Sequence, residues 1–205
     1  MSFLQSCLVV ATRLVTGANA VWLEERPTGP VRIFFANHGS HLDFATVYAT
    51  LPAALRAKTR PVAARDYWAK NRFVRFFAVR LSNALLISRD TVTREDNPVD
   101  QMAAALKEGW SLILFPEGTR SMDGTVASFK SGLYHLATKA PEVELVPVYL
   151  QNLNRILPKG HLLPVPLLST VVFGPAIKLE EGEHKADFLR RAREVLMSLI
   201  PPGSG

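Results

Sequence analysis

His38 and Asp43 follow the first predicted strand of the chain and carry its clearest chemical signal. They lie five residues apart, so a turn between them would bring the carboxylate to the imidazole. A carboxylate on one ring nitrogen fixes the tautomer and leaves the other nitrogen to accept a proton. Only Ser40 is a nearby candidate nucleophile. We therefore expect His38 to act as a general base on a hydroxyl of the substrate itself, with Asp43 as its orienting partner.

Two other interpretations of this pair stay open on the residues alone. A single His–Asp pair is often no more than a structural hydrogen bond. His38, His41 and Asp43, together with a later Glu, also offer the side chains that a metal ion accepts as ligands.

A second polar turn spans residues 115–121. Pro116 and Gly118 predict a tight turn whose backbone N–H groups can face an anion. Arg120 supplies a forked cation that suits phosphate or carboxylate. Glu117 could hold that arginine or accept a substrate hydroxyl. The alternative is an ordinary turn with a surface arginine.

Short β-branched or apolar runs alternate with helical patterns from residue 31 onward. The predicted strands are 31–36, 61–64, 84–88, 111–115, 144–150 and 169–173, and the predicted helices are 41–51, 67–79, 98–107, 130–138 and 185–199. This order predicts an α/β fold, a single domain with a mostly parallel central sheet flanked by helices. Active sites in such sheets collect at the carboxyl ends of the strands. The strand that ends at Arg89 would add a second arginine for a phosphate.

The N-terminal region carries one charge, Arg13, within an apolar stripe of helical spacing. A spanning helix needs about 20 mostly apolar residues, and an arginine at its middle would cost roughly 2.5–3.5 kcal/mol. We expect residues 1–24 to form an amphipathic helix in the membrane interface, with Trp22 near the headgroups. The alternative is a helix packed on its own domain. Residues 25–200 would form the globular domain, and residues 201–205 a flexible tail.

Composition and charge limit the class of protein. The 205 residues can bury one core, and 48% apolar with 20% charged residues argues against long disorder. The single Cys7 cannot form an internal disulfide. The net charge of +6 is concentrated in residues 56–80, with eight basic residues against Asp66. Residues 67–80 mix basic and aromatic side chains, which suits an anionic membrane surface, an acyl carrier protein or coenzyme A phosphates; alternatively, the aromatics are core and the charges face solvent.

Four blocks in this order resemble the glycerolipid acyltransferases of the lysophosphatidate (1-acylglycerol-3-phosphate) acyltransferase type. The blocks are NHGSHLD (37–43), LLISR (85–89), FPEGTRS (115–121) and VPVYL (146–150). Residues 129–132 (FKSG) also look like the segment downstream of the third block, and the resemblance covers roughly residues 31–175. One position departs from the pattern, since Asn83 stands where the second block usually opens with Gly.

The resemblance implies an acyltransferase domain over residues 25–200, with His38 as general base and Asp43 as its partner. The resemblance also implies which residues surround the glycerol phosphate, namely Arg89, Glu117, Gly118, Thr119 and Arg120. The supporting positions that match its blocks are Asn37, Ser40, Lys130, Gly132 and Pro147. The implied reaction moves a fatty acyl group from acyl-coenzyme A or acyl carrier protein to the free hydroxyl of a lysophospholipid. The leading acceptor is 1-acylglycerol-3-phosphate, which would give phosphatidate. No metal and no cofactor beyond the thioester co-substrate is implied.

The implied partners are the lysophospholipid, the thioester donor and an anionic membrane surface. The chain would act at the cytoplasmic face of a membrane as a peripheral or monotopic protein. Two enzymatic alternatives are acyl transfer to another lysolipid and a lipid thioesterase or hydrolase that uses the same His–Asp pair on water. No nucleic-acid partner is expected. A nucleic-acid binder would explain basic residues among aromatics, but it leaves both polar turns unexplained.

Overall fold

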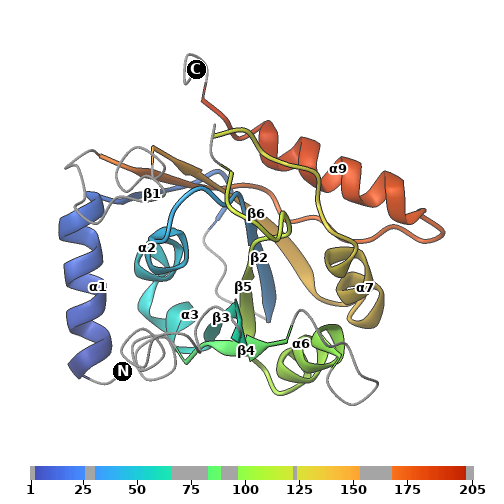
Figure 1. Ribbon diagram of the computed structural model, residues 1–205, viewed down its shortest axis with the longest axis horizontal. Coiled ribbons are helices and arrows are strands. Elements are labelled where there is room, and N and C mark those ends of the chain that lie inside the picture. Colours follow the sequence, from blue (N-terminus) through green and yellow to red (C-terminus); the bar gives the residue numbers. More distant parts are fainter. Residues whose placement is uncertain are drawn as a thin grey trace.

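Seven strands form one twisted sheet through the middle of the protein, with helices on both faces (Figure 1). The computed structural model describes residues 3–25, 31–65, 83–88, 97–121, 124–152 and 168–201. The strands are β1 (Asn19–Trp22), β2 (Arg32–Ala36), β3 (Thr59–Ala64), β4 (Leu85–Ile87), β5 (Ser111–Leu114), β6 (Glu144–Gln151) and β7 (Thr170–Phe173).

The strands lie in the order β1-β7-β6-β2-β5-β3-β4. All neighbouring pairs are parallel except β6 and β7, which are antiparallel. The predicted α/β fold with a mostly parallel sheet is therefore confirmed. Because β2, β5, β3 and β4 are parallel neighbours, the polar segments that follow them meet at one edge of the sheet.

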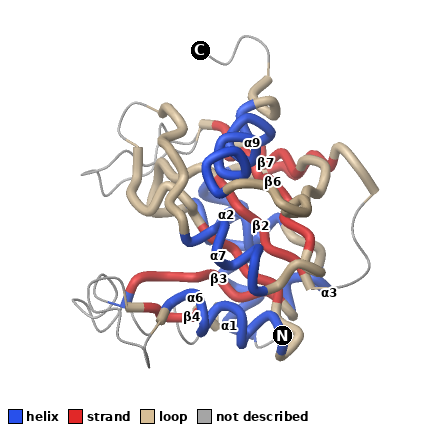
Figure 2. The backbone as a smooth tube through the Cα atoms, turned by 90° about the vertical axis from the view of Figure 1, so that its right-hand side faces the viewer, coloured by secondary structure: helices blue, strands red, loops and turns tan. Residues whose placement is uncertain are grey.

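The helices form a layer on each side of the sheet. They are α1 (Phe3–Thr16), α2 (Asp43–Thr50), α3 (Ala53–Ala57), α6 (Pro98–Lys107), α7 (Gly132–Lys139) and α9 (Lys185–Met197). Figure 1 shows α1, α2 and α3 on one side, and α6, α7 and α9 on the other. In Figure 2, turned by 90°, this second layer faces the viewer in front of the strands.

Strand β2 shows why the sheet is buried on both faces. Ile33 and Phe35 join the core beneath α6, α7 and α9, while Phe34 and Ala36 join the core beneath α1 and α2. All four side chains are fully buried. A strand between two helical layers needs an unbroken apolar run, since neither face meets water. The run IFFA, directly before the polar block at 37–43, meets this need.

The N-terminal helix is shorter than predicted and does not reach residue 24. It ends at Thr16 because Gly17 adopts a left-handed conformation, with φ of +54°. The next residues form β1, which pairs with β7. Trp22 lies in this strand and not in a helix, and its ring stacks on Phe173 with 3.9 Å between centroids. Its place near lipid headgroups stays a prediction.

One face of α1 packs on the domain. Val9, Thr12 and Thr16 are buried, whereas Val10 and Leu14 are 57% and 81% exposed. No helix in the described part of the chain is both long and apolar enough to cross a membrane. Whether the exposed face meets a membrane stays a prediction. The predicted helix 67–79 and the basic–aromatic segment 67–80 lie outside the described residues.

Candidate active site

The loop after β2 brings His38 and Asp43 together as their spacing predicts. His38 Nδ1 lies 2.7 Å from Asp43 Oδ2, and the same oxygen accepts the backbone N–H groups of Gly39 and Ser40 at 2.8 and 2.9 Å. Asp43 is 1% exposed. An ionised carboxylate only accepts hydrogen bonds, so the proton on His38 sits on Nδ1, and Nε2 is left as the acceptor.

Two further contacts fix the imidazole in place. The ring of His38 stacks on Phe115, with centroids 4.4 Å apart and planes 23° apart. The backbone N–H of His38 donates to Glu117 Oε1 at 2.7 Å, and its carbonyl accepts the N–H of Ser121 at 2.8 Å. The loops after β2 and β5 therefore hold one another, as expected for neighbouring parallel strands.

Glu117 faces inward, away from solvent. It is 2% exposed, and its second oxygen accepts the backbone N–H of Ala127 at 2.7 Å. Burial raises the pKa of the Glu117 carboxyl, while the N–H groups of Ala127 and His38 act against that shift. Both oxygens are thus engaged by backbone. This geometry favours a positioning role over the predicted contact with substrate.

Two of the supporting residues brace the loop after β2, and a third lies in the strand beside β2. The side-chain amide of Asn37 donates to the Leu150 carbonyl at 3.1 Å, and its oxygen accepts the Leu150 N–H at 2.7 Å. Ser40 is buried, and its backbone N–H holds Asp43. Pro147 lies in β6, in register with Phe35 of β2. Asn37 thus anchors the loop that presents His38, while the carbonyl of Pro147 accepts the N–H of Gly174 at 2.9 Å.

The turn after β5 presents polar groups to a large cavity. Gly118 has φ of +75°, a conformation that favours glycine. It is followed by Thr119, which is exposed, and Arg120, which contacts the His41 imidazole. Burial is the main cause that lowers the pKa of the His41 imidazole, and the positive charge of Arg120 is the second. Among the described residues, no cluster of three or more His, Cys, Asp or Glu side chains could hold a metal ion.

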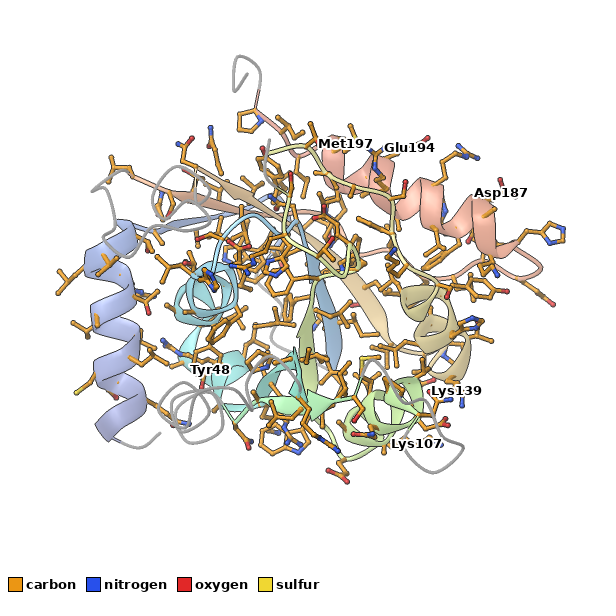
Figure 3. All side chains as sticks on the ribbon, in the orientation of Figure 1. Tyr48, Lys107, Lys139, Asp187, Glu194 and Met197 are labelled. Atoms are coloured by element: carbon orange, nitrogen blue, oxygen red, sulfur yellow. The ribbon has the colours of Figure 1, made fainter. Side chains whose placement is uncertain are left out.

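The cavity has a volume of about 1190 Å³ and runs from His38 between the carboxyl ends of β3, β4 and β5 and helices α6 and α7. The basic side chains that line it are Arg120, Lys130 and Lys139. No Asp or Glu is found among its described lining residues. Lys139, labelled in Figure 3 beside α6, forms an ion pair with Asp100.

The rest of the cavity wall is mostly apolar. It includes Ala64, Ile87, Val99, Met102, Leu114, Leu133 and Leu136, contributed by β3, β4, α6, β5 and α7. Gly132 also lines it, at the first position of α7. The backbone N–H of Lys130 donates to Pro116 O at 2.8 Å, which joins the start of this helix to the turn after β5.

The second block falls partly outside the described residues. Arg89 lies outside them, so its predicted place beside the phosphate stays a prediction. Asn83, which stands where the family usually has Gly, has φ of +51°. Asn tolerates this left-handed conformation better than most other non-glycine residues. The departure from the family pattern thus keeps a backbone shape that glycine would favour.

Comparison with known proteins identifies the family. The family model named Acyltransferase matches residues 20–151 of the chain. The chain belongs to the acyltransferase family. It is 29% identical over 182 residues to a 1-acyl-sn-glycerol-3-phosphate acyltransferase of Chlamydomonas reinhardtii, a match that covers 86% of this chain and 50% of the relative. A protein of the same name from Cocos nucifera is 27% identical over 180 residues, covering 83% of this chain and 56% of the relative.

A solved acyltransferase has the same fold. The structure of the 1-acyl-sn-glycerophosphate acyltransferase PlsC from Thermotoga maritima aligns with a TM-score of 0.76 and 22% identity. The alignment covers 96% of this chain and 76% of PlsC. The chain spans about half the length of the curated acyltransferases from Chlamydomonas and Cocos.

Several features of the site have no signal in the sequence. Phe115 belongs to a recognised block, but its stacking on His38 depends on two strands becoming neighbours. The apolar wall comes from elements that are far apart along the chain, such as Ala64 and Leu136. The inward direction of Glu117 depends on Ala127, which comes ten residues later. These contacts arise only when the sheet assembles.

Proposed function

We propose that this member of the acyltransferase family transfers a fatty acyl group from an acyl thioester to the free hydroxyl of a lysophospholipid. The proposed acceptor is 1-acylglycerol-3-phosphate, and the product is phosphatidate. The observation that carries the proposal is the His38–Asp43 pair, which backbone N–H groups hold beside a cavity lined by basic and apolar side chains. The curated relatives are named for the acceptor 1-acyl-sn-glycerol-3-phosphate, which has an anionic phosphate and an apolar acyl chain.

In the proposed reaction, His38 is the general base. Its Nε2 removes the proton from the lysolipid hydroxyl while that oxygen forms a bond to the thioester carbonyl carbon. Asp43 stabilises the imidazolium that results. When the tetrahedral intermediate collapses, the carbon–sulfur bond breaks, and the proton on Nε2 passes to the departing thiolate. The imidazole returns to its starting state, and no acyl group is attached to the protein.

The basic side chains that line the cavity support a phosphate at the acceptor. Arg120 carries a forked guanidinium that can bind two phosphate oxygens. Lys130 packs beside Gly118 of the same turn, since a Cβ added at Gly118 would lie 3.4 Å from Lys130 Cγ. Arg89 and Thr119 stay part of the proposed phosphate site.

The apolar wall supports a fatty acyl chain. The cavity is larger than a typical small-molecule site of about 300–1,000 Å³. Burying each CH₂ group contributes about 0.8 kcal/mol, so such a wall can hold a long chain with its reacting carbon near His38. The donor is proposed to be acyl-coenzyme A or acyl carrier protein. Binding at the cytoplasmic face of an anionic membrane stays part of the proposal.

The test is thiol release from acyl-coenzyme A, with and without 1-acylglycerol-3-phosphate, alongside lipid analysis of the product. We expect release that requires the acceptor and yields phosphatidate. His38→Ala should lower the rate about 10²–10⁴-fold. His184→Ala is the matched control, because His184 is exposed at the start of α9 and lies outside the cavity lining.

Two other outcomes decide between the alternatives. Thiol release that is independent of the acceptor and lost in His38→Ala would assign the pair to a thioesterase. The experiment is repeated with an acyl carrier protein thioester as donor. Failure to form phosphatidate with either donor would overturn the proposed acceptor.

A further inference from the structure

A second cavity, of about 300 Å³, lies beside the C-terminal end of α2, which is the end farther from the active site. Its walls come from the end of α1, the start of β1 and the turn from α2 to α3, and include Arg13, Asn19, Trp22, Thr50 and Arg56. It shares no described lining residue with the active-site cavity. The eight residues of α2 correspond to about 12 Å of helix. This smaller cavity is called the arginine pocket below.

Two arginines converge on a single acceptor in the arginine pocket. Arg13 donates from Nε and Nη2 to the Ala49 carbonyl at 3.1 and 2.9 Å. Arg56 Nη1 lies 3.5 Å from the same oxygen, at the outer limit of a hydrogen bond. Arg56 is 7% exposed, and its buried Nε has no hydrogen-bond partner. The guanidinium of Arg56 is thus poorly satisfied by the protein.

The charges in the arginine pocket are not balanced by the described residues. None of the described Asp or Glu side chains forms an ion pair with Arg13 or Arg56. The carboxyl end of α2 supplies the equivalent of about −0.5 charge, against two full positive charges. Burial and then the charge of Arg13 lower the pKa of Arg56, while Tyr48 (Figure 3) acts against them. Arg56 is buried, whereas Arg13 is exposed. Because a buried charge in a protein is normally paired, Arg56 points to an anion supplied from outside the protein, which the exposed Arg13 can also contact.

We propose that the arginine pocket binds a phosphate group. A phosphomonoester carries about −1.5 to −2 charge at neutral pH, which matches the two guanidinium groups, and their planar forks suit its oxygens. The volume equals about ten water molecules at roughly 30 Å³ each, enough for a phosphate with a small polar group attached. This inference does not depend on the proposed acyl transfer.

Two sources of such a phosphate are consistent with the surroundings. One is inorganic phosphate or a small phosphorylated compound from solution. The other is a phospholipid headgroup, because α1 and β1 also carry exposed apolar side chains, including Leu14 at 81% and Val21 at 38%. Both sources use the same recognition by Arg13 and Arg56, so the experiment has an arm for each.

The decisive variant is Arg56→Met, with Lys58→Met as the matched control. Lys58 is exposed, directly follows α3 and lies outside the arginine pocket lining, so its variant removes one charge without altering the pocket. Inorganic phosphate binding is measured by titration calorimetry. Thermal unfolding is followed in phosphate and in chloride of equal ionic strength. Flotation with phosphatidylcholine vesicles, with or without phosphatidylglycerol, tests the lipid arm.

We expect Arg56→Met to weaken either inorganic phosphate binding or phosphatidylglycerol-dependent flotation by about tenfold or more, since hydrogen bonds to charged groups contribute about 1.5–3 kcal/mol. In chloride it should be as stable as wild type or more stable, because an unpaired buried cation is removed. A purely structural arginine would lower stability in both salts. If Arg56→Met weakens only the binding of inorganic phosphate, the ligand is a soluble phosphate compound. If it weakens flotation with phosphatidylglycerol vesicles, the ligand is a lipid headgroup.

Other cations, including those of the active-site cavity, can also bind phosphate, so only the difference between Arg56→Met and Lys58→Met counts. Equal phosphate affinity and equal flotation for the two variants would overturn the proposal. If Arg56→Met does not fold in chloride, Arg13→Gln is put through the same measurements, and the same comparison decides.

Discussion

Replacing Asp43 by Asn separates the charge of the carboxylate from its shape. One oxygen, Oδ2, accepts from His38 Nδ1 and from two backbone N–H groups, at 2.7–2.9 Å. The other oxygen, Oδ1, is buried and has no hydrogen-bond partner. The amide oxygen of Asn can therefore occupy the position of Oδ2, and its NH₂ group can occupy the position of Oδ1. The variant would keep the turn while it loses the negative charge.

The expected loss in rate follows from the role of that charge. Without it, the imidazolium formed when His38 takes up a proton is no longer stabilised. The contribution of a well-placed general base is about 10²–10⁴-fold in rate, and each factor of ten corresponds to about 1.36 kcal/mol. We expect Asp43→Asn to lower kcat by a comparable factor, with KM for the lysophospholipid almost unchanged. The three hydrogen bonds become neutral, and each weakens by about 1 kcal/mol or less.

The assay combines steady-state thiol release with thermal unfolding of the same preparation. Asp43→Ala serves as the comparison, because it leaves His38 and both backbone N–H groups without their acceptor and should unfold at a lower temperature than Asp43→Asn. If Asp43→Asn is fully folded and keeps more than about a third of the wild-type kcat, a difference of only about 0.6 kcal/mol, the reasoning is refuted. Asp43 would then be only a cap for the turn.

Three further predictions concern stability. Burial raises the pKa of the Glu117 carboxyl above 4.5, so the folded chain binds this proton more tightly than the unfolded chain. The contribution of Glu117 to the free energy of unfolding therefore grows as the pH falls from the folded pKa toward 4.5. Glu117→Gln removes this titration and turns its NH₂ group toward a backbone N–H. In urea unfolding we expect the variant to lose about 1–3 kcal/mol of the free energy of unfolding at neutral pH, and more than that at mildly acidic pH. A difference from wild type that does not change with pH would contradict the assignment. At Gly118 an added methyl group has room beside Lys130, but the backbone φ of +75° is unfavourable for alanine. We therefore expect Gly118→Ala to lose about 1–2 kcal/mol of the free energy of unfolding in the same assay. An unchanged urea midpoint would show that this turn is not constrained. Trp22→Ala removes the stack on Phe173 and should cost about 2 kcal/mol, less than for a fully buried ring; a shift in thermal midpoint no larger than that of an exposed substitution such as Lys58→Met would contradict the packing of β1.

The element pattern was largely predictable because each strand and helix has a local signature. The run IFFA must be a buried strand, and Asn97-Pro98 marks the start of α6, where the Asn97 side chain accepts the N–H of Val99 at 2.9 Å. Helix α6 spans the predicted residues 98–107. The error at the N-terminus has a non-local cause. Residues 19–22 continue an apolar stripe, but they become a strand because β7, some 150 residues later, offers them hydrogen bonds.

The short helix α3 was also missed, since five residues are too few for a periodic pattern. Its role becomes visible only in three dimensions, where Arg56 meets Arg13 across the arginine pocket. Nothing in the sequence connects these two arginines. Arg56 is the first of the eight basic residues counted in 56–80, and Arg13 is the one charge of the N-terminal region. Their convergence on Ala49 depends on α1 packing against α2.

The α/β class and the contact between His38 and Asp43 follow from the residues alone, because strand patterns and a five-residue turn are local properties. The arrangement of the cavity was decided only by the tertiary structure. Strands β2 and β5 become neighbours although about 80 residues separate them, and this pairing places Phe115 on the imidazole and turns Glu117 inward. Local propensity cannot encode such contacts, since they depend on which strands the whole core brings together.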